Sequence, residues 1–163
     1  GRRELSGGQI NEQCTHFVDL IRYFCGEIVE VVAMAQPEAP NAESDIDVAA
    51  AAILRAASGA LATLYASCGA QTKEIGFTVF TPSQQISLDD WDLHPRGSET
   101  QPDEIDPFDA EVAAFLHAVR TGETGAILSD LADALQTQRV IDALVRSLHS
   151  RRWEPVPPAN ANS

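Results

Sequence analysis

A change of hydrophobic period at Gly26 constrains the fold more than any other feature of the sequence. From residue 11 to residue 25 the apolar side chains recur every three or four residues, a spacing that places them on one side of a helix. Gly26 comes directly after them and favours a helix end, because glycine accepts the left-handed conformation there. Residues 27–35 are rich in β-branched side chains and predict a strand. The chain therefore combines helix and sheet from its first elements.

Two apolar stretches joined by a short turn predict a hairpin in the middle of the chain. Residues 47–57 and 60–67 are connected across Ser58-Gly59, and glycine suits a tight turn. The alanines of residues 47–57 would suit a helix equally well on propensity. The hairpin context favours a strand for both arms.

The next segments predict a second hairpin and a long loop. Residues 74–81 and 84–88 form the two arms, with the turn at Thr81-Pro82-Ser83. Residues 89–107 are acidic and interrupted by prolines, so we expect them to form a long surface loop.

The last third of the chain predicts two helices. The first covers residues 107–121, with Asp106 as its N-cap and a proline at its first position, and the second covers residues 129–150. A short strand at 153–156 and a disordered tail at 157–163 are expected to follow.

These elements predict one α+β domain over residues 1–156, with an open, largely antiparallel sheet and helices on one face. The strands carry apolar side chains on both faces, so we expect another domain or subunit to cover the second face. The side chains that indicate this are those of Ala50, Ile53, Leu61, Ala62, Leu64 and Phe77.

Composition excludes several classes of partner. The chain has 163 residues, and its 11 Lys and Arg against 24 Asp and Glu give a net charge of −13, which argues against nucleic-acid binding. No stretch approaches the ~20 apolar residues of a membrane span. Three cysteines without a CxxC pair suggest buried, inert thiols in a reducing compartment, so we expect a cytoplasmic protein.

A polar stripe accompanies the apolar side of the first predicted helix. Glu12, His16, Asp19 and Tyr23 are spaced i, i+4, i+7 and i+11, within about 60° of one line along a helix. The stripe has three interpretations. It could be an ordinary solvated face, a metal site that lacks a second His or Cys at ligand spacing, or an acid–base site built on the imidazole. The spacing alone does not select among them.

The sequence also resembles a known family. The segment GGQINEQCTHFVDL, residues 7–20, resembles the pattern GG-x-x-x-[DE]-x-x-x-H-x-x-D-L. That pattern opens the C-terminal domain of glucose–fructose oxidoreductase and inositol dehydrogenase-like (Gfo/Idh/MocA) enzymes. The likeness continues through residues 22–31, Gly59 to Leu64 and Phe108 to Val156, and thus covers almost the whole chain.

This resemblance implies a fold and a role. It implies the C-terminal domain fold that is also described as glyceraldehyde-3-phosphate-dehydrogenase-like, with the free sheet face packed on a second subunit of a homo-oligomer. It implies NAD or NADP as cofactor, bound mainly by a Rossmann domain, and a sugar, polyol or related hydroxy compound as substrate. His16 is the implied catalytic acid/base and Glu12 its partner. The residues expected to bind substrate are Asn11, Asp19 and Tyr23. For Asp19, which matches the family's HxxD aspartate, the resemblance favours a structural role.

The cofactor-binding half of such an enzyme is not in this sequence. The chain has no GxGxxG segment and no EKP lysine, and it begins at Gly1 rather than at a methionine. We therefore expect a piece of a longer enzyme that is inactive by itself. The alternative is a non-catalytic module that keeps the fold for self-association.

Overall fold

The computed structural model describes residues 8–36, 46–72, 74–89, 92–96 and 106–158. These residues belong to two compact units. The first comprises residues up to 73 together with those from 134 onward, and the second comprises residues 74–133. The predicted tail falls largely on residues 159–163, outside the described part.

The first helical segment of unit one is two helices rather than one. Helix α2 is Gln9–Gln13 and helix α3 is Thr15–Cys25, with a break at Cys14. The prediction of one continuous helix from residue 11 was therefore wrong. At the break the hydroxyl of Thr15 donates a 2.8 Å hydrogen bond to the carbonyl of Asn11. Such back-bonding by threonine competes with the helical backbone and bends helices.

Helix α3 ends at the expected glycine. Gly26 has φ 84° and ψ −169°, and its N–H donates to the carbonyl of Arg22 at 2.8 Å. The positive φ is what only glycine adopts readily, although ψ is extended rather than left-handed helical.

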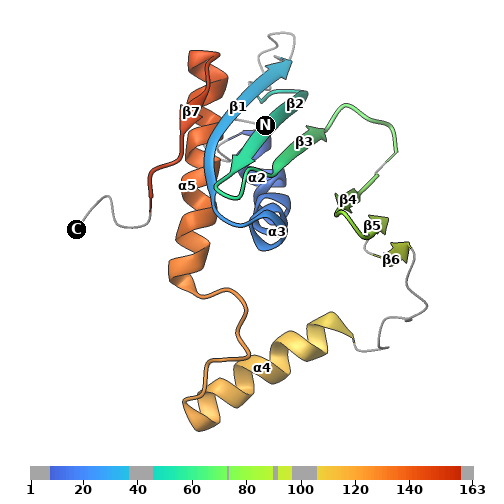
Figure 1. Cartoon of the computed structure of the whole chain (residues 1–163), viewed down its shortest axis with the longest axis vertical. Helices are drawn as coiled ribbons and strands as arrows, with labels where there is room; N and C mark the ends of the chain where they lie inside the picture. The colour runs from blue at the N-terminus through green and yellow to red at the C-terminus, as the bar shows by residue number, and fades with distance from the viewer. Residues whose placement is uncertain (1–7, 37–45, 73, 90–91, 97–105, 159–163) are drawn as a thin grey trace. The chain divides into compact units, whose positions relative to one another are not determined.

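The sheet of unit one is antiparallel, as expected. Its strand order is β3-β2-β1-β7, and helix α5 (Leu131–Ser150) lies alongside β1 and β7 (Figure 1). The alanine-rich arm of the first hairpin is a strand, which confirms the choice made from its context. The strands are β1 (Ile28–Gln36), β2 (Ala49–Ala56), β3 (Leu61–Ser67) and β7 (Glu154–Pro155).

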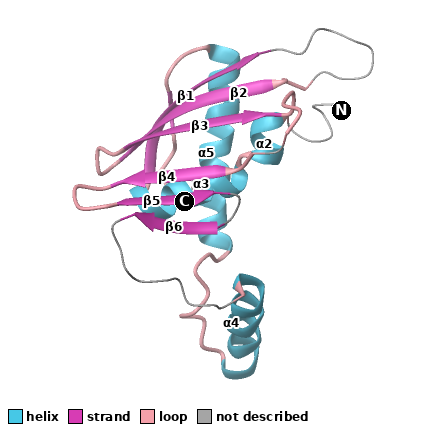
Figure 2. Ribbon diagram, turned by 90° about the vertical axis from the view of Figure 1, so that its right-hand side faces the viewer, coloured by secondary structure: helices cyan, strands magenta, loops and turns pink. Residues whose placement is uncertain are grey.

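One face of this sheet builds the core. Helices α2, α3 and α5 lie on the same side of strands β1–β3 (Figure 2). Val31 of β1 pairs with Leu54 of β2, and both are fully buried beneath the helices. The helices supply the matching apolar side chains, because their apolar residues recur at helical spacing. Those that are at most 2% exposed are Ile10, Val18, Ile21, Val140, Ile141, Ala143 and Leu144.

The opposite face of the sheet is apolar and uncovered in unit one. Met34, Ala51 and Tyr65 lie opposite one another across β1, β2 and β3, and Ile53 and Leu61 continue the same face. Met34 is 74% exposed and Tyr65 is 71% exposed. The expected two-sided apolar character of the strands is thus confirmed here. We call Met34, Ile53, Leu61 and Tyr65 the outer sheet face.

The described residues of unit two form a second sheet and the helix α4 (Pro107–Thr121). Strands β4 (Gly76–Phe80), β5 (Gln85–Asp89) and β6 (Asp92–Arg96) form an antiparallel sheet in the order β4-β5-β6. The first two strands are the predicted hairpin. Strand β6 was missed, since it lies within the acidic, proline-interrupted segment 89–107 that was predicted to be a loop. Pro95 is compatible with a strand because β6 lies at an edge of its sheet.

Helix α4 (Pro107–Thr121) of unit two has the predicted bounds and caps. Asp106 accepts a 2.8 Å hydrogen bond from the N–H of Phe108, and Gly122 ends the helix at φ 79°. No residue of α4 is buried. The α+β class with an antiparallel sheet is confirmed, and no helix among the described residues is long and apolar enough to cross a membrane.

Candidate functional site

The two residues predicted to act together are on different helices. Glu12 is near the end of α2 and His16 is in the first turn of α3, on either side of the break at Cys14. Both side chains are exposed, and neither has a hydrogen-bond partner among the described residues. The helical path is nevertheless kept across the break, since Cys14 N–H donates to the carbonyl of Ile10 and Val18 N–H to that of Cys14. Glu12 and His16 thus lie about one turn apart along a bent helical path.

The start of that path depends on a glycine. Gly8 precedes α2 with φ 89° and ψ 177°, and its carbonyl accepts a 3.0 Å hydrogen bond from Glu12 N–H. Because side chains are rarely tolerated at this positive φ, a glycine is needed at the entry to the helix. Gly7, the other glycine of the pair, lies outside the described residues.

Asp19 takes part in a network that connects α3 to α5. Its Oδ1 accepts a 2.7 Å hydrogen bond from Oγ1 of Thr137 and lies 3.6 Å from Nη1 of Arg22. Arg22 Nη1 also donates to Thr137 Oγ1 at 2.8 Å, and its Nη2 donates to Oε1 of Glu27 at 2.9 Å. Asp19 therefore has protein partners on one side, while its side chain remains 43% exposed.

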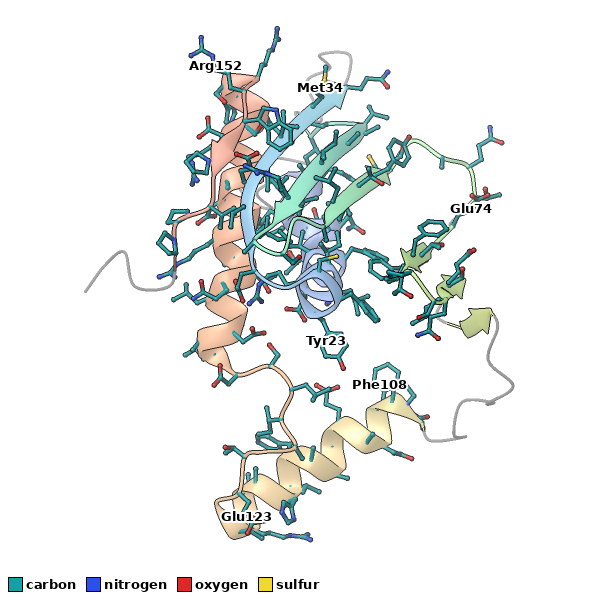
Figure 3. All side chains as sticks on the ribbon, in the orientation of Figure 1. Tyr23, Met34, Glu74, Phe108, Glu123 and Arg152 are labelled. Atoms are coloured by element: carbon teal, nitrogen blue, oxygen red, sulfur yellow. The ribbon has the colours of Figure 1, made fainter. Side chains whose placement is uncertain are left out.

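Tyr23 points away from the sheet at the end of α3 (Figure 3). Its ring is 69% exposed and packs edge-on against that of Phe24, with 5.2 Å between the centroids. The structure thus places Tyr23 two turns from His16 on α3, and does not bring the two side chains together in a cavity.

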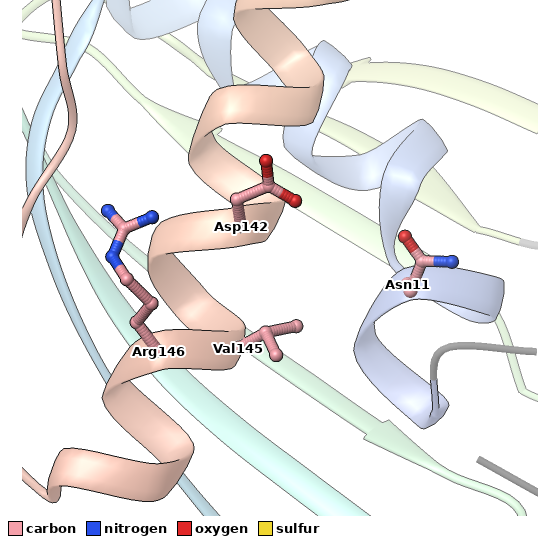
Figure 4. Close-up of a pocket in the computed structure, with 4 residues that line it drawn as sticks. All are labelled: Asn11, Asp142, Val145 and Arg146. Atoms are coloured by element: carbon pink, nitrogen blue, oxygen red, sulfur yellow. The ribbon is translucent and has the colours of Figure 1, made fainter. Parts of the chain in front are cut away.

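Asn11 lines a shallow depression between α2 and α5. The depression has a volume of about 440 Å³, and Asn11 faces Asp142 and Val145 across it (Figure 4). Arg146, its fourth lining residue, donates a 3.0 Å hydrogen bond to the carbonyl of Pro155. Neither Glu12 nor His16 lines it. Of the five predicted site residues, only Asn11 is in this depression.

Sequence reasoning missed the buried polar residues beneath the site. Arg22 is 6% exposed and Thr137 is 3% exposed. Arg22 belongs to the segment that resembles the family, but no role was derived for it. Thr137 is 118 residues from Asp19, in a polar stretch of α5, and no local pattern indicates their contact.

The cysteines have different environments. Burial raises the pKa of the Cys14 thiol to about 11 and also raises the pKa of Cys25. Cys14 is the buried, inert thiol that was expected. Cys68 is exposed, and the expectation of burial was wrong for it. Its position directly after β3 explains the exposure, because it follows the last residue paired in the sheet.

The described residues do not form a metal centre or a dinucleotide cradle. They include no group of three or more His, Cys, Asp and Glu side chains close enough to hold an ion. Gly8 precedes the five-residue helix α2, without the GxGxxG spacing that lets a pyrophosphate approach a helix N-terminus. The residues present therefore do not fit a dinucleotide pyrophosphate.

Comparison with protein families matches residues 1–86 to the model of the GFO/IDH/MocA C-terminal domain. The chain belongs to this family. The match includes the segment with Glu12 and His16 and the sheet formed by β1, β2 and β3. None of the curated proteins searched matches this GFO/IDH/MocA domain significantly.

Solved structures show the same fold. Levoglucosan dehydrogenase in complex with NADH is 21% identical, with a TM-score of 0.75, over 92% of this chain and 50% of that one. The WlbA dehydrogenase from Bordetella pertussis, in complex with NADH and UDP-GlcNAcA, is 20% identical, with a TM-score of 0.76, over 97% of this chain and 49% of that one. The GFO/IDH/MocA domain described here thus spans about half the length of these structures.

Proposed function

We propose that this chain is the substrate-binding and oligomerisation domain of an NAD(P)-dependent oxidoreductase that acts on a hydroxyl group of a sugar, polyol or related compound. The observation that carries the proposal is the family match over residues 1–86, which contain Glu12 and His16 as exposed side chains. Two similar structures support the substrate class, since one is a complex of levoglucosan dehydrogenase with NADH and levoglucosan, and the other contains NADH and UDP-GlcNAcA.

In this proposal His16 handles the proton of the reacting hydroxyl. Removing a hydride from the carbon that bears a hydroxyl leaves a protonated carbonyl unless a base takes the proton. The neutral imidazole of His16 accepts that proton and becomes imidazolium, and in the reverse reaction it returns the proton. The carboxylate of Glu12, one turn earlier along the bent helical path, orients the imidazole or the substrate.

The nicotinamide cofactor is bound by another part of the full-length protein in this proposal. NAD(P) supplies the hydride acceptor, while this domain supplies the proton acceptor and the substrate contacts. Glu12 and His16 are then exposed because they line one side of a site that the cofactor domain completes from the other side.

The outer sheet face is the proposed oligomer interface, with a second copy of the chain as its occupant. Met34, Leu61 and Tyr65 are each more than two-thirds exposed, at 74%, 68% and 71%. A contiguous apolar surface of this kind on a regular sheet is characteristic of an interface. Two copies related by a two-fold axis bury the same patch on each partner.

The catalytic proposal is tested by replacing His16 with alanine in the full-length protein. We expect kcat for NAD(P)H formation to fall by about 100-fold or more, because general acid–base groups typically contribute 10²–10⁴-fold. The matched control is His149→Ala, since His149 is an exposed histidine near the end of α5. Near-full activity of the His16→Ala protein contradicts the catalytic proposal and favours a non-catalytic self-association module.

A further inference from the structure

A single buried hydroxyl joins the helix of His16 to the long helix behind it. Thr137 of α5 donates its proton to Asp19 Oδ1 at 2.7 Å and accepts one from Arg22 Nη1 at 2.8 Å. Both Thr137 and Arg22 are more than nine-tenths buried. The direction of these bonds is fixed, because a guanidinium cannot accept a hydrogen bond and a carboxylate cannot donate one. The hydroxyl is therefore held in one orientation.

The network also reaches beyond α3. Arg22 donates its second terminal nitrogen to Glu27, which lies just after the glycine that ends the helix. Arg22 Nη1 and Asp19 Oδ1 are 3.6 Å apart, so the two ends of the hydroxyl bridge attract each other directly. The last turns of α3 are thus tied both to α5 and to the start of the sheet.

His16 has little packing of its own, whereas its helix is held by the network and by the buried side chains of Val18 and Ile21. Its side chain is exposed, so the ring's position follows from the rotation and axial position of α3. Asp19 is one turn after His16 on the same helix, and it is the network residue nearest to His16 in sequence. Toward its N-terminus α3 begins at the break at Cys14, where the backbone is less regular.

We propose that Thr137 is a positioning residue for His16: through Asp19 and Arg22 it fixes the rotation and axial position of α3, and so the place of the imidazole relative to the reacting hydroxyl. This inference rests on the proposed acid–base role of His16. It assigns a role in the reaction to a side chain of α5 that is only 3% exposed. Its physical basis is that small displacements of a reacting group are costly, about 100-fold for 1 Å.

The test compares three variants of the full-length protein. Thr137→Val keeps the shape of the side chain and removes the hydroxyl, and we expect kcat to fall about tenfold with KM changed less than about threefold. Thr137→Ser keeps the hydroxyl, and its kcat should stay within about threefold of the wild type. Leu144→Ala removes a wholly buried side chain from α5 two turns away, and should lower the melting temperature while leaving kcat nearly unchanged.

A double variant separates positioning from general loosening. If Thr137 acts through His16, then Thr137→Val should lower kcat less than about twofold when His16 is already alanine, because the two effects are not independent. Amide hydrogen exchange supplies a readout that needs no activity. In the Thr137→Val protein, exchange should become faster in residues 16–22 of α3 and stay unchanged in β2.

The outcomes distinguish this inference from the proposed function. Wild-type kcat in Thr137→Val overturns the positioning role, as does an equal loss in Leu144→Ala or a full tenfold loss in the His16→Ala background. If His16→Ala itself retains activity, the acid–base proposal fails and this inference fails with it. Loss in His16→Ala together with wild-type activity in Thr137→Val leaves the proposed function standing and removes only the inference.

Discussion

The hydroxyl of Ser147 in α5 accepts a 2.9 Å hydrogen bond from the backbone N–H of Ala33 in β1. The same hydroxyl donates to the carbonyl of Arg152 at 2.6 Å. Strand β7 pairs with β1 only at Glu30 and Val31, so Ala33 lies just beyond the end of that pairing. A side chain of the helix thus replaces the missing strand partner at the edge of the sheet.

Replacing Ser147 with alanine should lower the free energy of unfolding by about 2 kcal/mol. Ser147 is fully buried, and the substitution leaves both the Ala33 N–H and the Arg152 carbonyl without this partner. Urea unfolding of the chain measures the change. Ser150→Ala, at an exposed position of the same helix, should change it by less than about 0.5 kcal/mol. Equal effects of the two substitutions would contradict the bridging role of Ser147.

Arg151→Gly should stabilise the chain by about 0.5–1 kcal/mol. Arg151 follows the last residue of α5 and is held at φ 57° by a 2.8 Å hydrogen bond from its N–H to the Ser147 carbonyl. Glycine adopts this left-handed conformation without the steric cost that a side chain incurs. This gain in the folded state outweighs the greater conformational entropy of glycine in the unfolded chain. Thermal unfolding measures the gain. The next arginine is the control: Arg152→Gly should give no gain, since its φ is not in the left-handed region.

Charges on the outer sheet face should prevent self-association. We expect the chain to sediment as a dimer or higher oligomer at micromolar concentration, and Ile53→Arg or Tyr65→Glu to convert it to a monomer with little change in circular dichroism. The reason is that a charge in the centre of an apolar interface loses its hydration without a partner. Ala57→Arg, at an exposed position after the end of β2, should leave association intact. A wild-type chain that sediments as a monomer would rule out this interface.

The Cys14 thiol should make the stability of the chain fall at high pH. Burial raises its pKa to about 11, whereas the pKa of a thiol in the unfolded chain is about 8.5. The unfolded state therefore loses its proton first. The contribution of Cys14 is fully present below about pH 8.5 and is lost as pH rises toward 11, by roughly 1–3 kcal/mol. Urea unfolding at pH 8 and pH 10.5 measures the difference.

Cys14→Ala is the control for that measurement. It removes the titrating thiol, so its free energy of unfolding should fall less between the two pH values than that of the wild type, although it starts from a lower value because of the cavity. The same pH dependence in both proteins would show that other groups are responsible.

Several features of the fold could be predicted because they depend on neighbouring residues. The bounds of α4 follow from Asp106, Pro107 and Gly122, whose capping and breaking properties are local. The β2–β3 hairpin follows from the Ser58-Gly59 turn, and Gly59 has the positive φ that this turn requires. The alternation of buried and exposed residues in β2 is likewise a consequence of strand geometry.

The errors occurred where a local signal competed with a partner elsewhere. Strand β6 contains Asp92 and Pro95, residue types typical of a loop, yet it pairs with β5 over residues 92–96. At the break at Cys14 the hydroxyl of Thr15 bonds back to the carbonyl of Asn11, a detail that hydrophobic periodicity does not detect. The exposure of Cys68 depends on where β3 stops.

By itself, the sequence determined the type of each long element, the family motif around Glu12 and His16, and the two-sided apolar character of the strands. Each of these is a property of residue types and spacings along the chain. Only the tertiary structure decided that Thr137 contacts both Asp19 and Arg22, and that Ser147 completes the edge of β1. Such contacts join residues more than 110 positions apart, and they depend on how α5 is rotated against the sheet. That rotation is set by the packing of the whole core, which is built from residues of many separate segments of the sequence.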